Sequence, residues 1–157
     1  MPTSTLHRYT SHPRAFRVLA SLYPPLLGAG IRIREIAPDW SRGVLTMHVM
    51  RWTANFNGSA FGGALFSATD VLYGSLLAGR LGSGYQVWTR STTIDFLRPG
   101  RGTLTCVVEV PLEEVETIRE ALATAPKTSV EHVAELRSAD GTVVARARHT
   151  MSVRVRG

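Results

Sequence analysis

The chain has 157 residues, 44% hydrophobic and 19% charged, which is typical of one globular domain and excludes a fibrous or disordered protein. No stretch reaches the ~18 consecutive apolar residues of a membrane helix, and residues 1–9 lack the apolar core of a secretory signal. Cys106 is the only cysteine, which excludes an internal disulfide and a cysteine-rich metal site. We therefore expect a single domain over residues 1–157, in the cytoplasm.

The net charge of +6 favours anionic partners but does not choose among them. Four arginines near the C-terminus recur at even spacing, as on the solvated face of a strand: Arg146, Arg148, Arg154 and Arg156. A surface for nucleotide phosphates or nucleic acid is the alternative interpretation. Because no aromatic residues are interleaved with these arginines, stacking on single-stranded bases has little support, and we expect no nucleic-acid partner.

The first half of the chain begins with an N-terminal helical extension over residues 1–28. Its apolar spacing predicts a helix within residues 13–27, which Pro24 and Pro25 should end. Two strands joined by a hairpin are predicted over residues 30–37 and 43–52. Residues 61–79 are apolar all round, which predicts a central helix buried on every side.

The second half reads mainly as antiparallel sheet. β-branched and alternating residues predict strands over residues 85–97, 103–110, 129–137 and 143–155. An amphipathic pattern predicts a surface helix over residues 112–125. The chain order of these elements indicates an α+β fold.

Asp70 is the one charged side chain from Trp52 through Gly79, and it lies in the middle of the predicted central helix. Burying a carboxylate is costly unless it is hydrogen-bonded, and desolvation makes a carboxylate a stronger base, as general-base catalysis requires. Asp70 is therefore a candidate catalytic group. Alternatively, it bonds a backbone amide or Arg90, or faces a wet subunit interface.

The turn before this helix contains Asn55, Asn57, Gly58 and then Phe61-Gly62-Gly63. The free N–H groups at a helix N-terminus, together with the helix dipole, favour a developing oxyanion. The Gly-Gly pair also has a plainer explanation, namely tight packing of helix against sheet.

The spacing of Gly63 and Asp70 has a geometric consequence. Seven residues at 1.5 Å each separate them by roughly 10 Å along a helix, so one carbonyl cannot lie about 3 Å from both. If both groups act, Asp70 must come from a partner subunit, and the spacing predicts an obligate homodimer with two equivalent centres.

The string Asn55-x-x-Gly58-x-x-Phe61-Gly62-Gly63-x(6)-Asp70 resembles the N-x-x-G-x-x-H-G-G…D signature of hotdog-fold thioesterases of the phenylacetic-acid-pathway type. The wider match, GGALFSATDVLYG followed by YQVWTRSTTIDFLRPGRG, is most similar to the uncharacterised DUF4442 or YiiD C-terminal-like branch. The resemblance covers about residues 30–155. It implies a hotdog fold, in which a curved antiparallel β-sheet wraps around a long central helix, and a homodimer that is often paired into a homotetramer.

The resemblance also implies roles for individual residues. Asp70 stands at the position of the catalytic acid, acting as general base or nucleophile, and the amide of Gly62 or Gly63 would polarise the thioester carbonyl. Asn55 would orient the carbonyl or water, and Thr89 would assist the water. Two arginines of the turn after the third predicted strand would meet the phosphates of CoA: Arg98 and Arg101.

One departure from the signature is Phe61, which replaces the histidine and can neither donate a hydrogen bond nor take a proton. The pocket is expected to be more apolar, with an acyl channel lined by Phe61, Phe66, Leu72 and Tyr73. No histidine stands in at motif spacing. His48 and His149 lie in strands and are interpreted as structural, while His7, His12 and His132 follow no pattern, so neither a metal nor another cofactor is predicted.

Several functions remain open. The first is hydrolysis of an acyl-CoA or similar thioester. The second is a binding protein that holds acyl-CoA or a lipid-like ligand without turnover, which the loss of the histidine makes credible. Dehydratase chemistry normally needs the missing histidine and is disfavoured, and a purely structural dimer is a weaker option.

Overall fold

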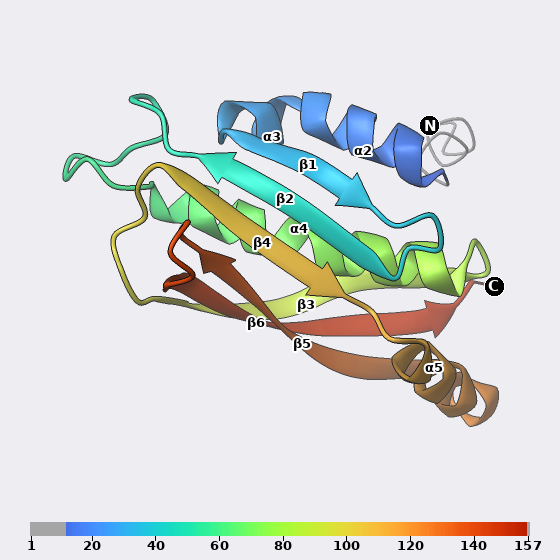
Figure 1. Cartoon of the computed structure of the whole chain (residues 1–157). Coiled ribbons are helices and arrows are strands. Elements are labelled where there is room, and N and C mark those ends of the chain that lie inside the picture. The colour runs from blue at the N-terminus through green and yellow to red at the C-terminus, as the bar shows by residue number, and fades with distance from the viewer. Residues whose placement is uncertain (1–11, 157) are drawn as a thin grey trace.

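The computed structural model describes residues 12–156 and shows one curved sheet around one long helix, as predicted (Figure 1). The six strands lie in the order β1-β2-β4-β5-β6-β3, and every neighbouring pair is antiparallel. Their bounds are β1 Ile31–Ile36, β2 Arg42–His48, β3 Tyr85–Phe96, β4 Thr103–Glu109, β5 Lys127–Arg137 and β6 Val143–Val155. The helices are α2 Pro13–Leu22, α3 Pro24–Gly28, α4 Gly62–Leu81 and α5 Leu112–Thr124.

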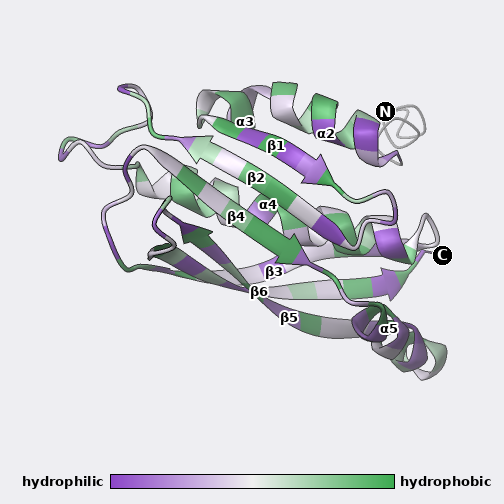
Figure 2. Ribbon diagram, viewed as in Figure 1, coloured by the Kyte–Doolittle hydropathy of each residue, from purple (hydrophilic) through white to green (hydrophobic). Residues whose placement is uncertain are grey.

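Alternation of residue types accounts for the strands. Figure 2 shows hydrophobic and hydrophilic bands following one another along β1. In β6, Ala145, Ala147, His149, Met151 and Val153 are all buried, as the sequence pattern predicts. This alternation places one face of the sheet against α4 and leaves the other outside.

The second strand is shorter than predicted, and helical structure continues at the two prolines. The strand predicted over residues 43–52 ends at His48, because the backbone turns at Met50, whose N–H donates to Thr53 Oγ1 at 2.7 Å. The first helix ends at Leu22 as expected, but Pro24 and Pro25 then begin the short helix α3. Proline is accepted in a first helical turn because its missing N–H would have had no partner there. The beginning of the predicted N-terminal extension, residues 1–11, lies outside the described residues.

Helix α4 packs closely against the sheet at its C-terminal end. A Cβ on Gly79 would lie 2.2 Å from Cδ2 of Trp40, a buried residue of the β1–β2 hairpin with a φ of 62°. Gly82 ends the helix with a φ of 91°, a conformation suited to glycine. The helix and the hairpin are therefore held together at a contact that leaves no room for a side chain on Gly79.

The prediction that α4 is buried on every side was wrong for this single chain. One face is buried, with Leu65, Leu72 and Leu76 no more than 3% exposed. The opposite face includes Gly63, Phe66 and Asp70, which remain exposed or half-buried because the sheet curves around α4 from one side only. No helix within residues 12–156 is long and apolar enough to cross a membrane.

The two edges of the sheet differ. Helix α2 lies beside β1, where Ser21 Oγ accepts from the Ile33 N–H at 3.0 Å and covers part of that edge (Figure 1). Strand β3, with twelve residues, is the other edge, and among the described residues its outer side has no strand partner. A long open edge is a template for pairing with another chain.

Candidate active site

Asp70 lies on the open face of α4, next to the edge strand β3. Its side chain is 39% exposed, and Thr89 of β3 donates its hydroxyl to Asp70 Oδ1 at 3.2 Å. The structure thus places side by side two residues that the sequence analysis named as site candidates. A half-exposed carboxylate with one fixed hydrogen bond has a free oxygen lone pair available to a water or an acyl group.

A histidine that the sequence analysis interpreted as structural lies behind Asp70. His149 is buried in β6, and its Nδ1 is 3.7 Å from Asp70 Oδ1 and 2.9 Å from Thr92 Oγ1. Burial lowers the pKa of His149, an effect that the nearby Asp70 charge and the Thr69 backbone oppose. The neutral imidazole is therefore the form in contact with Asp70 at neutral pH.

The polar cluster continues into the core. The ring of His132 stacks on Tyr73 with centroids 3.9 Å apart, and the Tyr73 hydroxyl donates to Glu114 of α5. Burial lowers the pKa of His132 to about 4, with a further contribution from His149. Burial first, and then the hydrogen bond to Glu114, raise the pKa of Tyr73 far above its usual range. Both rings therefore stay uncharged at neutral pH.

The N-terminus of α4 presents free backbone donors. Ala64 and Leu65 donate to the Phe61 carbonyl at 3.0 and 3.1 Å, whereas within the described residues the N–H groups of Gly62 and Gly63 have no acceptor. The exposed ring of Phe61 lies over Gly63, where an added Cβ would be 2.5 Å from Phe61 Cε1. These two amides are available to an oxyanion.

Asn55, Gly62 and Arg98 line one pocket of about 370 Å³ beside this N-terminus. Asn55 Oδ1 is occupied within its own turn, accepting from the backbone N–H groups of Asn57 and Ser59 at 2.9 and 3.2 Å. Only its amide Nδ2 remains to meet a ligand. Arg101 is exposed and lies outside this pocket.

The residues predicted to line an acyl channel separate into two groups. Phe61 and Phe66 are exposed beside the open face of α4. Leu72 and Tyr73, further along α4, are fully buried, and Tyr73 packs on His132. Within one chain, therefore, only the two phenylalanines are accessible to a ligand.

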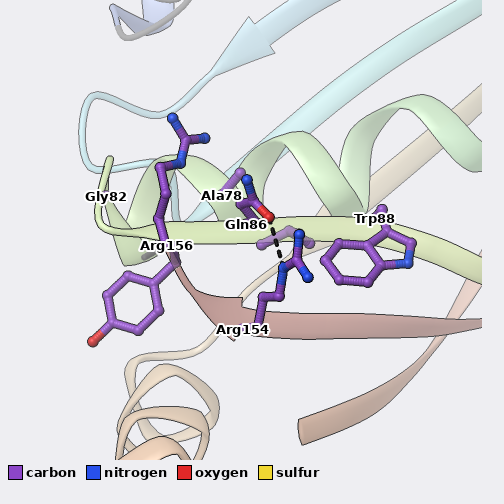
Figure 3. Close-up of a pocket in the computed structure, with 8 residues that line it drawn as sticks. Ala78, Gly82, Gln86, Trp88, Arg154 and Arg156 are labelled. Carbon is purple, nitrogen blue, oxygen red and sulfur yellow. Dashed lines mark hydrogen bonds between the residues drawn. The ribbon is translucent and has the colours of Figure 1, made fainter. Parts of the chain in front are cut away.

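A second pocket, of about 350 Å³, lies at the other end of α4, where β3 begins and β6 ends (Figure 3). Arg154 donates from Nε to Gln86 Oε1 at 2.7 Å, and its guanidinium lies 5.0 Å from the ring centroid of Trp88. Arg156 lines the same pocket. Within the described residues no carboxylate pairs with either arginine, so this pocket is positively charged.

Comparisons with known proteins agree with this architecture. A Pseudomonas aeruginosa protein of unknown function, named as a probable thioesterase, is similar over 89% of this chain and 93% of its own, with 21% identity and a TM-score of 0.82. The PaaI protein of the E. coli phenylacetic acid degradation operon matches with 25% identity and a TM-score of 0.64, over 89% of this chain and 90% of its own. Thioesterase HI1161 of Haemophilus influenzae matches with 17% identity and a TM-score of 0.68, over 90% of both chains. No curated protein matches in sequence.

The fold is therefore a hotdog fold, and the predicted resemblance to the hotdog thioesterase superfamily is confirmed. Residues 13–153 match the model of DUF4442, described as a domain of unknown function, and the chain belongs to that family.

Proposed function

We propose that this protein hydrolyses acyl-CoA or related thioesters, with Asp70 as the catalytic carboxylate. The observation that carries the proposal is the placement of Asp70: a half-exposed acid, held by Thr89, on the open face of the central helix. Two of the similar structures, one named as a probable thioesterase and one as a thioesterase, support the reaction class. As general base, Asp70 would take a proton from water as the water oxygen attacks the thioester carbonyl, and would return it to the departing thiolate. As nucleophile, its carboxylate would attack the acyl carbon, the C–S bond would break to release the thiolate, and water would then hydrolyse the mixed anhydride to the free acid and Asp70.

The oxyanion of the tetrahedral intermediate is expected to bind at the N-terminus of α4, where Gly62 and Gly63 have free N–H groups. Asp70 is seven residues further along the same helix, roughly 10 Å away at 1.5 Å per residue. One thioester carbonyl therefore cannot contact both the N-terminal amides of α4 and Asp70 of the same chain. The proposed centre therefore combines Asp70 of one subunit with the α4 N-terminus of a second copy.

The open edge of β3 supports such a dimer. Asp70 is bonded to this strand through Thr89, so a copy that pairs along the edge would approach the carboxylate. The exposed aromatic ring of Phe96 on the same strand would also be covered. Pairing would extend the sheet across both subunits and remove the unpaired edge.

The charged pocket of Trp88, Arg154 and Arg156 is a candidate site for the anionic end of the substrate, in addition to Arg98 and Arg101. Gln86 and Trp88 hold the Arg154 guanidinium in place, which reduces the entropy lost when it binds a phosphate. We expect Arg154→Gln to raise KM for an acyl-CoA about 10-fold, on the order of one charge-assisted hydrogen bond. KM for the same acyl group on N-acetylcysteamine, which lacks the phosphates, should not change. An equal change for both substrates would remove this pocket from CoA recognition.

A second candidate function, binding of an acyl-CoA or lipid-like ligand without turnover, is favoured by one observation. The ring of Phe61 lies over Gly63, where the signature has a histidine. Release of free CoA from short, long and aromatic acyl-CoAs separates the two functions. We expect Asp70→Ala to lower turnover by ~100-fold or more. A wild-type protein that binds these esters without releasing CoA would favour the binding function. Equal rates of CoA release by the wild type and Asp70→Ala would remove Asp70 from the mechanism.

A further inference from the structure

His149 contacts the candidate catalytic carboxylate from a strand far away in sequence. In the register of β3 and β6, Thr92 is opposite His149, and a bulge between Thr89 and Ser91 allows Thr89 and Thr92 both to face α4. Thr89 therefore reaches Asp70 directly, and Thr92 reaches the Nδ1 of His149. The carboxylate, the imidazole and the two hydroxyls form one cluster.

The surroundings of His149 favour one tautomer. Its Nδ1 has an acceptor-only carboxylate at 3.7 Å and a hydroxyl at 2.9 Å, whereas its buried Nε2 has no partner among the described residues. A proton on Nε2 would leave a donor buried without an acceptor and turn the Nδ1 lone pair toward the carboxylate. A proton on Nδ1 instead has an acceptor within reach, and the positive end of the Nδ1–H dipole then points toward Asp70.

We infer that His149 is a positioning residue for Asp70: its Nδ1–H, shared with the Thr92 hydroxyl, stabilises the carboxylate and holds it toward the open face of α4. This role rests on the proposed hydrolysis. His149 does not replace the signature histidine that is absent from position 61, because it is buried and cannot touch substrate. Its effect passes entirely through Asp70.

The groups facing His149 leave it as a neutral donor. Asp70 and the Thr69 backbone face it from α4, Thr92 from β3 and His132 from β5. Behind His132 lie Tyr73 and Glu114, joined by a hydrogen bond. Burial of the imidazole outweighs the attraction of Asp70, so the pKa of His149 is below its usual value.

Two substitutions of similar polarity test the inference through activity. Asparagine places its amide near the position of Nδ1, whereas glutamine places it near Nε2. We expect His149→Asn to keep kcat within about 3-fold, and His149→Gln to lower kcat by roughly 10-fold with little change in KM, because the N–H that faces the carboxylate at 3.7 Å is removed from a site of low dielectric. The acid limb of the kcat/KM–pH profile should move to higher pH in H149Q alone. Equal kcat and equal pH profiles in the two variants would overturn the inference.

The tautomer of the wild-type protein gives a test that needs neither a variant nor an active enzyme. The ring ¹⁵N chemical shifts of His149, assigned through contacts with the Thr92 methyl group, distinguish the two neutral tautomers. We expect the proton on Nδ1 at neutral pH. A proton on Nε2 would overturn the positioning role whether or not the protein hydrolyses thioesters, while Nδ1–H in an inactive protein would count against the proposed function only.

Discussion

Replacement of Gly63 by proline removes one backbone N–H from the N-terminus of α4 and little else. That N–H has no acceptor within the described residues, so no hydrogen bond of the fold is lost. Gly63 is the second residue of the helix, a position that proline already occupies in α3 at Pro25. The atoms nearest to a Cβ at this position all belong to the Phe61 side chain, which is exposed and can rotate away. The variant should therefore fold as the parent does.

The expected loss of activity follows from the role of the amide. One oxyanion donor contributes about 10²- to 10³-fold in kcat, or roughly 3–4 kcal/mol. We expect Gly63→Pro to lower kcat by that factor in a CoA-release assay, with a midpoint of thermal unfolding within about 3 °C of the parent.

Gly63→Ala is the matched control, because it adds the same Cβ beside Phe61 but keeps the N–H. Its kcat should stay within about 5-fold of the wild type, since no transition-state donor is lost. If the proline and alanine variants have the same kcat, the Gly63 amide takes no part in stabilising the oxyanion.

Three further predictions concern the hydrogen bond to the carboxylate, the packing of α4 and the half-buried imidazole of His132. Thr89→Val should lower kcat about 10-fold, the lower end for a hydrogen bond to a charged group at 3.2 Å, and unchanged kinetics would refute a role for the hydroxyl. Gly79→Ala should destabilise the fold by about 1–3 kcal/mol in urea unfolding, because its Cβ would meet the Trp40 ring. Gly74→Ala is the control: its Cβ would meet only the flexible end of a methionine side chain, so it should destabilise the fold less. Equal effects of the two substitutions would contradict this packing. The pKa of His132 is lowered from 6.5 to about 4, so the unfolded state binds more protons in this window, and stability should fall by about 3 kcal/mol as pH drops from 6.5 to 4. His132→Phe should lose that part of the pH dependence, and an unaltered slope would show that the imidazole is not its source.

The order of the elements could be predicted from the sequence because each strand and helix has its own period of apolar residues. The position of Thr89 beside Asp70 also followed, since the resemblance extended through both segments. These features depend on the local pattern of apolar residues and on matched segments that follow one another along the chain.

The role of His149 could not be read in the same way. Its alternation in β6 correctly predicted burial, but its distance from Asp70 depends on the pairing of β3 with β6 and on the bulge after Thr89. A bulge changes which residues share a face, and no residue in that segment signals it. Similarly, an all-apolar helix gives no indication of which residues other elements cover, so Tyr73 was placed with Phe66 in the acyl channel although Tyr73 is buried and Phe66 is exposed.

Subunit complementation tests most directly the central claim that Asp70 and Gly63 act on one carbonyl from two different chains. Asp70→Asn and Gly63→Pro would each be purified as inactive proteins, dissociated, mixed in equal amounts and allowed to reassociate. Half of the dimers would be mixed, each with one intact centre of two, so the account predicts recovery of about a quarter of wild-type CoA release. If the two groups act within one chain, both centres of the mixed dimer are defective, and the absence of any recovered activity would contradict the account.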